Sequence, residues 1–232
     1  MHNATSPLSR LRLAIAAGVP WTHLSDVLAL QRLEEPKVKL DFFEVAGDDL
    51  VRGLLDGQYD VGLALRGHGD PSLKGQSMWV QPLWAERLVV ATPPQSPLLD
   101  RTELLLTDLL DYPLYRWPAE VCLLLDRRLS FLPPVDQKSI HCTTSFEMLA
   151  QFVAAGYGVG VTAHSRIERT NGWGSRISMR AVADGPFEIL TQLLRPYRAT
   201  NAAAERFEQR ALLVAIAVDG ERRSKAQTAY LL

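Results

Sequence analysis

Two arginines closely follow predicted strands, where a basic side chain could bind an anion. Arg66 comes directly after the apolar stretch 60–65, and Arg116 follows a short strand expected at 112–115 and is itself followed by Trp117. Ligands of parallel α/β sheets bind beyond the carboxyl ends of the strands. A guanidinium at such a strand end could bind a carboxylate or a phosphate. An arginine in a solvated loop would have the same sequence context, so both interpretations stay open.

The turn at 143–145 offers polar groups of another kind. Thr144, or Thr143, together with Glu147 forms a Thr-x-x-Glu pattern, which is typical of a capping box at a helix N-terminus. The free N–H groups of that helix start, with the Ser145 hydroxyl, could also bind an anionic ligand. Capping alone would explain the same residues equally well.

A third candidate turn runs from Gly18 through Val19 and Pro20 to Trp21, after the strand expected at 11–16. Pro20 has no backbone N–H, so this turn has one donor fewer than usual. Trp21 could form an apolar or stacking wall for a ligand. Packing of Trp21 in the core is an equally good explanation.

Signatures of catalysis and of metal binding are missing from the sequence. It contains no Gly-x-Ser-x-Gly, no P-loop, no His-Glu-x-x-His, and no Gly-x-Gly-x-x-Gly after a strand. His164 has no obvious partner, and His68 lies in a predicted loop. Cys122 and Cys142 lack metal-ligand spacing, and we expect both to be buried, unpaired thiols. We therefore expect no catalytic residue, no metal and no cofactor.

The elements that must position these turns alternate between strand and helix. The first 65 residues predict, in order, a strand at 11–16, a helix at 20–35, a strand at 38–44, a helix at 48–56 and a strand at 60–65. The last of these strands is apolar throughout, as a strand covered on both faces should be. This order predicts a parallel sheet with helices on both sides.

The rest of the chain repeats the alternation. It predicts further strands at 87–91, 138–143, 157–162 and 187–194, and helices at 119–130, 145–155 and 202–217. No long Gly/Ser-rich linker interrupts the pattern, so ordered strands should join the parts. The residues after Asp219 are polar, and we expect them to be frayed.

Length, composition and charge limit the possible partners. The chain has 232 residues, of which 47% are hydrophobic and 22% charged, enough for two lobes of about 100 residues each. A net charge of -1 gives no overall positive field for nucleic acid or an anionic membrane. No apolar run reaches the roughly 20 residues of a membrane helix, and the first residues do not resemble a signal peptide. We therefore expect a cytoplasmic chain without a membrane partner.

Three segments resemble, in order, the effector-binding domain of LysR-type transcriptional regulators, a bacterial family. They are Asp49-Leu50 with the stretch 54–63, Pro82-Leu83-Trp84-Ala85-Glu86 with 87–91 and Ser96-Pro97-Leu98, and Thr144-Ser145-Phe146-Glu147-Met148-Leu149 with 152–161. Their order and separations match the family, and the resemblance covers about 10–217.

The resemblance implies an α/β fold of two Rossmann-like lobes joined by two crossover strands, similar to type II periplasmic binding proteins. We place the crossovers near 84–91 and 187–194. Lobe I then comprises 10–83 with 188–219, lobe II comprises 84–187, and 1–9 and 220–232 are flexible ends. Family members also carry an N-terminal winged helix-turn-helix that this sequence lacks, so DNA contact would need that missing domain.

The resemblance also implies a function and a site. Family members bind a small-molecule effector between the lobes and transmit closure to the DNA-binding domain. The helix starts and the arginines described above favour an anionic effector. Many of them place a Ser or Thr after the first strand, where this chain has Gly18 and Val19. The expected ligand-binding residues are Gly18, Val19, Pro20, Trp21, Gly47, Arg66, Arg116, Trp117, Thr144 and Ser145. Pairing through 20–35 and 38–44 would give a homodimer, and the full-length form would be a tetramer.

Two other classes of protein share this scaffold. A periplasmic solute-binding protein would have the same fold and binding mode, but it would be made as an exported precursor. An enzyme of this fold, such as a dehydratase, would need an acid–base pair facing the cleft, and the sequence offers no convincing pair.

Overall fold

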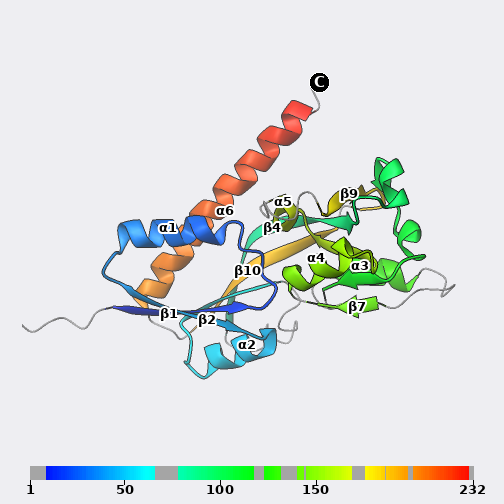
Figure 1. The fold of residues 1–232 in the computed structure, drawn as a ribbon. Helices are drawn as coiled ribbons and strands as arrows, with labels where there is room; N and C mark the ends of the chain where they lie inside the picture. The colour runs from blue at the N-terminus through cyan, green and yellow to red at the C-terminus, as the bar shows by residue number, and fades with distance from the viewer. Residues whose placement is uncertain are drawn as a thin grey trace, which may run out of the picture. The chain divides into compact units, whose positions relative to one another are not determined.

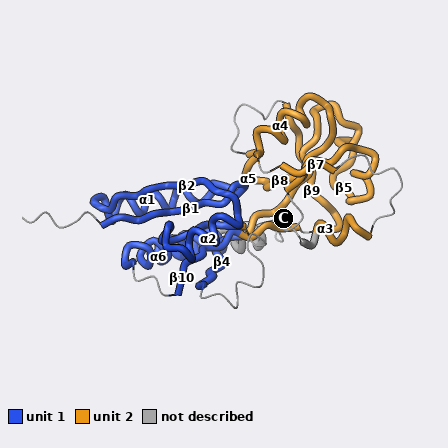
Figure 2. Tube along the Cα trace, turned by 90° about the horizontal axis from the view of Figure 1, so that it is seen from below, with its two compact units in different colours: residues 1–64, 69–84, 191–232 blue, residues 65–68, 85–190 orange. Residues whose placement is uncertain are grey.

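The computed structural model describes residues 9–65, 78–117, 123–131, 140–143, 145–168, 176–185, 187–197 and 201–229. The chain forms two compact units (Figure 2). Unit 1 comprises residues 1–64, 69–84 and 191–232, and unit 2 comprises residues 65–68 and 85–190. Unit 2 is thus built from the middle of the sequence, and unit 1 from both of its ends.

Unit 1 contains the predicted parallel β-α-β-α-β arrangement. Its first elements are β1 (Arg10–Ala16), α1 (Leu24–Glu34), β2 (Lys39–Val45), α2 (Gly47–Leu55) and β3 (Val61–Leu65). Both β2 and β3 pair in parallel with β1, and α1 and α2 cover opposite faces of this sheet (Figure 1). All five residues of β3 are buried because helices cover both of its sides.

The turn that ends α2 depends on glycine. Gly57 has a φ of 69°, a left-handed conformation that ends helices and that glycine adopts at little cost. Helix α1, in contrast, begins at Leu24, four residues later than predicted. Val19 and Pro20 are buried in the preceding turn, where the Val19 N–H donates to the Ala16 carbonyl at 3.2 Å.

The last helix, α6 (Ala202–Ala229), packs beside α1 and against β1 (Figure 1). It continues twelve residues beyond the predicted end at Ala217, so the segment expected to be frayed is helical to Ala229. The sequence after Gly220 contains no proline and is rich in Glu, Arg, Lys, Ala and Gln, which are good helix formers. Their propensity outweighs the cost of one interior glycine.

Two long strands pass from one unit to the other, as the sequence indicated. They are β4 (Met78–Thr92) and β10 (Glu188–Pro196), and they are neighbours in the sheet order β2-β1-β3-β10-β4-β8-β6-β7. Strand β4 has 15 residues and is much longer than predicted. Pro82 lies inside this strand. Because proline has no backbone N–H to donate, its presence in the sequence argues against a continuous strand.

Unit 2 is a second α/β layer structure. Strands β6 (Leu114–Arg116), β7 (Ile140–Cys142) and β8 (Val159–Ala163) are parallel, and β8 pairs with β4 in antiparallel fashion. Its helices are α3 (Leu123–Ser130), α4 (Phe146–Ala154) and α5 (His164–Glu168). The short elements η2 (Pro97–Asp100), β5 (Glu103–Leu104), η3 (Leu106–Leu109) and β9 (Ser178–Val182) were not predicted. Phe146, Leu149 and Val153 of α4 fill the core beneath the sheet.

Candidate functional site

In unit 1, the turn at 17–21 and the start of α2 lie at the same edge of the sheet. The parallel register pairs Ala16 with Val45, and the Ala17 N–H donates to the Val45 carbonyl at 2.8 Å. Gly18 adopts a φ of 89°, which favours glycine at this position. Val19 and Pro20 are buried, so the most accessible side chain of the turn is that of Trp21, which is 54% exposed.

Aromatic rings surround this turn. The Trp21 ring lies 5.7 Å from that of Phe42 on β2. Trp84 is fully buried with its ring 5.3 Å from that of His23, and the Trp84 Nε1 has no hydrogen-bond partner within the described part of the chain. Trp84 was not selected from the sequence as a site residue, although it belongs to the crossover segment that carries the family resemblance.

Gly47 is the first residue of α2, after the extended N-cap residue Ala46. No side chain caps this helix start, but Asp48 and Asp49 lie in its first turn. Their carboxylates already interact favourably with the positive end of the helix dipole. They reduce the attraction of this helix start for an anionic ligand.

In unit 2, the carboxyl ends of β6, β7 and β8 also share one edge. The parallel register places Trp117, Thr143 and His164 just beyond these strands, and the Thr143 N–H donates to the Arg116 carbonyl at 2.9 Å. The predicted turns of the middle segment therefore converge within unit 2. Arg66 and Thr144 lie outside the described residues.

Arg116 is engaged inside unit 2. Its side chain is buried, and it donates to the Asp126 carboxylate at 2.8 Å and to the Trp117 carbonyl at 3.2 Å. The ion pair neutralises its charge. Arg116 thus has a structural explanation, which competes with the prediction that it binds an anion.

Ser145, and not a threonine, caps α4. Its hydroxyl accepts a hydrogen bond from the Met148 N–H at 3.2 Å and donates to the Glu147 carboxylate at 3.0 Å. The Thr143 hydroxyl donates to the Ser145 carbonyl at 3.2 Å. The predicted threonine capping box is therefore wrong in its capping residue. The hydroxyl proposed to meet a ligand already has two partners.

Arg166 joins this edge and was not selected from the sequence. Its guanidinium carbon lies 4.8 Å from the ring centroid of the buried Trp117. Burial lowers the pKa of Arg166 to about 10, against the opposing effect of the Glu86 and Glu147 carboxylates, so it stays protonated at neutral pH. It follows β8 by three residues, and that position at a strand end is the signal that could have identified it.

Neighbouring groups hold this cluster together. The Ser165 hydroxyl donates to the carboxylate of Glu86, a buried residue of β4. The His164 Nδ1 lies 3.3 Å from the Glu168 Oε2. Across the described segments, no group of His, Cys, Asp and Glu side chains has the arrangement of a metal site. Cys142 is exposed, contrary to the expected burial, because β7 is a short strand at the end of the sheet. Cys122 lies outside the described residues.

Two α/β units linked by strands that pass through both define a protein with a type II periplasmic-binding-protein-like fold. The LysR substrate binding domain family matches residues 4–212 in its sequence model. The chain therefore belongs to this family, as an effector-binding domain of LysR-type transcriptional regulators.

Solved structures agree with this assignment of the fold. The effector-binding domain of a BenM variant is 17% identical, with a TM-score of 0.74 over 91% of this chain and 96% of that one. Reduced OxyR from N. meningitidis is 16% identical, with a TM-score of 0.71 over 89% and 95%. An OxyR variant from Corynebacterium glutamicum is 22% identical, with a TM-score of 0.70 over 97% of this chain and 70% of that one. No curated protein matches in sequence.

The family consists of regulatory domains and not of enzymes. Among the residues that the structure describes, no helix is both long enough and apolar enough to cross a membrane.

Proposed function

We propose that this chain is the ligand-sensing domain of a cytoplasmic LysR-type regulator. A small organic molecule binds between its two units, and the resulting closure is transmitted to a DNA-binding domain. The family match over residues 4–212 carries this proposal. The turns at the carboxyl ends of the parallel strands in each unit support it, because α/β sheets bind ligands there. The domain acts by binding alone, without catalysis.

The chemistry of the two edges favours a polar molecule with a planar or apolar part. Unit 1 contributes the exposed Trp21, and unit 2 contributes the Arg166 guanidinium, which lies over the buried Trp117 ring. Arg66 would add a second cation. An anionic group on the ligand would pair with these arginines, although Glu86 and Glu147 offset part of the charge of Arg166.

A thermal-shift screen of a metabolite panel tests this function. A ligand that binds only the folded chain at 100 times its Kd stabilises it by about 2.7 kcal/mol. Trp21→Ala, Arg66→Ala and Arg166→Ala should each weaken binding about tenfold, and Phe131→Ala, at an 84% exposed site in unit 2, should not. The proposal fails if a ligand is found and all three site variants bind it as tightly as the parent.

We further propose that two copies pair through α1 and β2, as the family resemblance implies. Strand β2 is at the end of the sheet order, and among the described strands it pairs with β1 alone. Phe42 and Phe43 on this strand are exposed, and Leu33 on α1 is 77% exposed. Exposed apolar residues beside an open strand edge are typical of a protein interface.

Sedimentation velocity tests the pairing. The parent should sediment as a dimer at micromolar concentration, and Leu33→Glu and Phe42→Glu should shift it to monomer. Phe131→Glu introduces the same charge at an exposed aromatic residue of unit 2 and should leave the dimer intact. A parent that is monomeric at tens of micromolar would contradict the proposal.

A further inference from the structure

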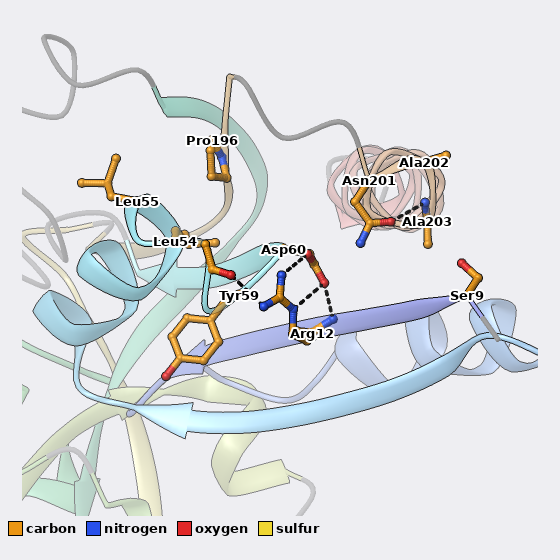
Figure 3. Close-up of a pocket in the computed structure, with 11 residues that line it drawn as sticks. Ser9, Arg12, Leu54, Leu55, Tyr59, Asp60, Pro196, Asn201, Ala202 and Ala203 are labelled. Carbon is orange, nitrogen blue, oxygen red and sulfur yellow. Dashed lines mark hydrogen bonds and ion pairs between the residues drawn. The ribbon is translucent and has the colours of Figure 1, made fainter. Parts of the chain in front are cut away.

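Unit 1 contains an open pocket where its parallel strands begin (Figure 3). Its walls come from the start of β1, the end of α2, the residues before β3, the end of β10 and the start of α6. The volume is about 620 Å³, within the range of about 300–1,000 Å³ that is common for small-molecule sites. The turn at 17–21 and Gly47 lie at the opposite ends of these strands, so this pocket is separate from the effector site proposed above.

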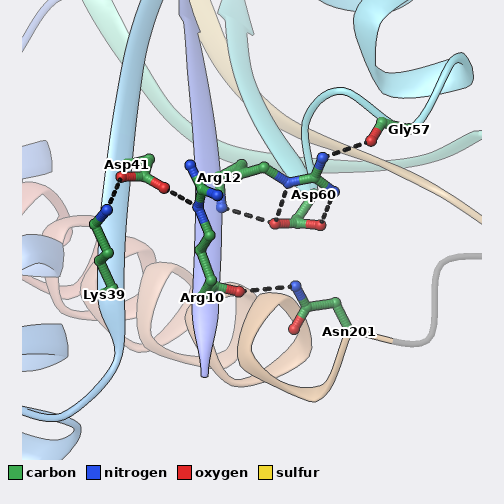
Figure 4. A network of polar contacts seen from close by, with 7 residues as sticks. All are labelled: Arg10, Arg12, Lys39, Asp41, Gly57, Asp60 and Asn201. Carbon is green, nitrogen blue, oxygen red and sulfur yellow. Dashed lines mark hydrogen bonds and ion pairs between the residues drawn. The ribbon is translucent and has the colours of Figure 1, made fainter. Parts of the chain in front are cut away.

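Arg12 and Asp60 form the polar wall of the pocket (Figures 3 and 4). The Arg12 Nε and Nη2 donate to the two Asp60 oxygens at 3.2 and 2.7 Å, and Nη1 donates to the Gly57 carbonyl at 2.7 Å. A guanidinium has five N–H groups, so these contacts use three of them. The Arg12 side chain is 33% exposed. Its other two N–H groups have no acceptor among the described residues, so a ligand can use them.

Both carboxylate oxygens of Asp60 already accept hydrogen bonds from Arg12. The Asp60 carboxylate also accepts from the Arg12 backbone N–H at 2.7 Å. Burial would raise the pKa of Asp60, but the hydrogen bonds from the Arg12 side chain and backbone outweigh this effect and hold the pKa below its ordinary value. An ionised carboxylate with these donors has little capacity left for an amine. The pocket therefore favours acceptors over donors in a ligand.

The surrounding network carries excess positive charge (Figure 4). Arg10 and Lys39 both pair with Asp41. Together with Arg12 and Asp60, the network holds three cations and two carboxylates. The network therefore has a net charge of +1, which favours an anion at the exposed side of Arg12.

The opposite wall of the pocket is apolar. Leu55 is 45% exposed, and Pro196 lies on the same side of the pocket (Figure 3). A compact hydrocarbon group placed against these two residues would remove their surface from water. The two walls thus suit the two parts of one amphipathic molecule.

We propose that this pocket is a second small-molecule site, which binds a monocarboxylate with a compact apolar body. The carboxylate accepts hydrogen bonds from Arg12, and the body covers Leu55 and Pro196. This proposal is independent of the effector site, since a ligand here contacts neither the turn at 17–21 nor unit 2.

NMR titration of the ¹⁵N-labelled chain tests the site. Cyclohexanecarboxylate is the probe, and cyclohexanecarboxamide is the uncharged analogue of nearly the same shape. We expect the acid to cause saturable shifts of the backbone amides at 57–60 and 201–203, and the amide to bind about tenfold more weakly. Absence of saturable shifts at millimolar acid, or equal binding of the two probes, would overturn the proposal.

Two variants sharpen the test. Leu55→Glu places a carboxylate at the mouth of the pocket and should abolish binding, whereas Leu213→Glu makes the same change at an exposed site on α6 and should have no effect. Binding that survives Leu55→Glu unchanged would also refute the site. Trp21→Ala should leave this titration unaltered, which separates the result from the outcome at the effector site.

Discussion

The Ser145 hydroxyl has two partners within the first turn of α4, so its substitution perturbs the fold before any ligand is considered. Ser145→Ala should lower the free energy of unfolding by about 1 kcal/mol through the lost cap. Ser145→Asn keeps an acceptor for the Met148 N–H and should retain most of the stability. Urea denaturation of the three proteins measures this difference. Equal stability of Ser145→Ala and the parent would show that the cap contributes nothing.

Asp60 links stability to pH. Its pKa in the folded chain is below the ordinary value of 3.8, so its contribution is complete above pH 3.8 and is lost as the pH falls through the lower folded value. Asp60→Asn should therefore be less stable than the parent at neutral pH, by about 1–3 kcal/mol.

Unfolding free energies measured from neutral to acidic pH check this prediction. The difference between Asp60→Asn and the parent should stay constant at neutral pH and shrink below pH 3.8. Asp56→Asn, a neighbouring exposed position, serves as the control and should stay within about 0.5 kcal/mol of the parent. A difference that grows on acidification has the wrong sign for this account.

At the scale of elements, polar side chains join α1 to α6. Arg210 is buried on α6 and donates to Glu34 at 2.7 Å, to Gln31 at 3.0 Å and to Glu35 at 3.0 Å. Helix α6 is thereby tied to the helix that we assign to the dimer surface. These contacts fix the rotation of α6 about its axis.

Arg210→Ala should lower the free energy of unfolding by about 1–3 kcal/mol, because the buried Gln31 Oε1 loses its donor and the Glu35 carboxylate keeps only Gln31 and the more exposed Arg206 as partners. Arg206 also pairs with Glu35 but is more exposed, so Arg206→Ala should cost less than about 1 kcal/mol. Chemical denaturation followed by circular dichroism measures both values. Similar losses in the two variants would contradict the role assigned to burial.

The sequence predicted the elements better than their ends. The apolar run at 61–65 and the glycines at 57 and 156 identified the buried strand and the helix ends, because these signals are local. The start of α1 was missed, since buried Val19 and Pro20 hold the turn through tertiary packing. The continuation of α6 was missed because the polar composition of 221–229 fits an exposed helix as well as a frayed end.

The candidate site was only partly predictable, for a similar reason. The strand-end rule placed Trp21, Trp117 and Ser145 at the sheet edges. It could not show that Asp126, ten residues after Arg116 in the chain, neutralises that arginine, because the pair forms only when α3 packs beside β6. Arg166 was overlooked because its cation–π contact with Trp117 leaves no pattern in the sequence.

For the whole molecule, charge determines what the isolated chain can do with nucleic acid. Affinity for duplex DNA depends on neutralising phosphates and on contacts with base edges. With a net charge of -1, the 232-residue chain should cause no sequence-specific mobility shift of duplex DNA at physiological salt. A sub-micromolar shift that depends on the DNA sequence would contradict this expectation.

The interleaving of the two units sets an order for biosynthesis. Unit 2 is complete once residue 190 has been made, whereas unit 1 still needs residues 191–232. Strand β10 lies between β3 and β4 in the sheet. One edge of the apolar strand β3 therefore stays unpaired until β10 has been translated, more than a hundred residues later. Ribosomes add about 5–20 residues per second, so the open edge of β3 persists for many seconds. We therefore expect the N-terminal half of the chain to need chaperones most. This half leaves the ribosome first but has to remain partly unpaired until the C-terminal residues follow.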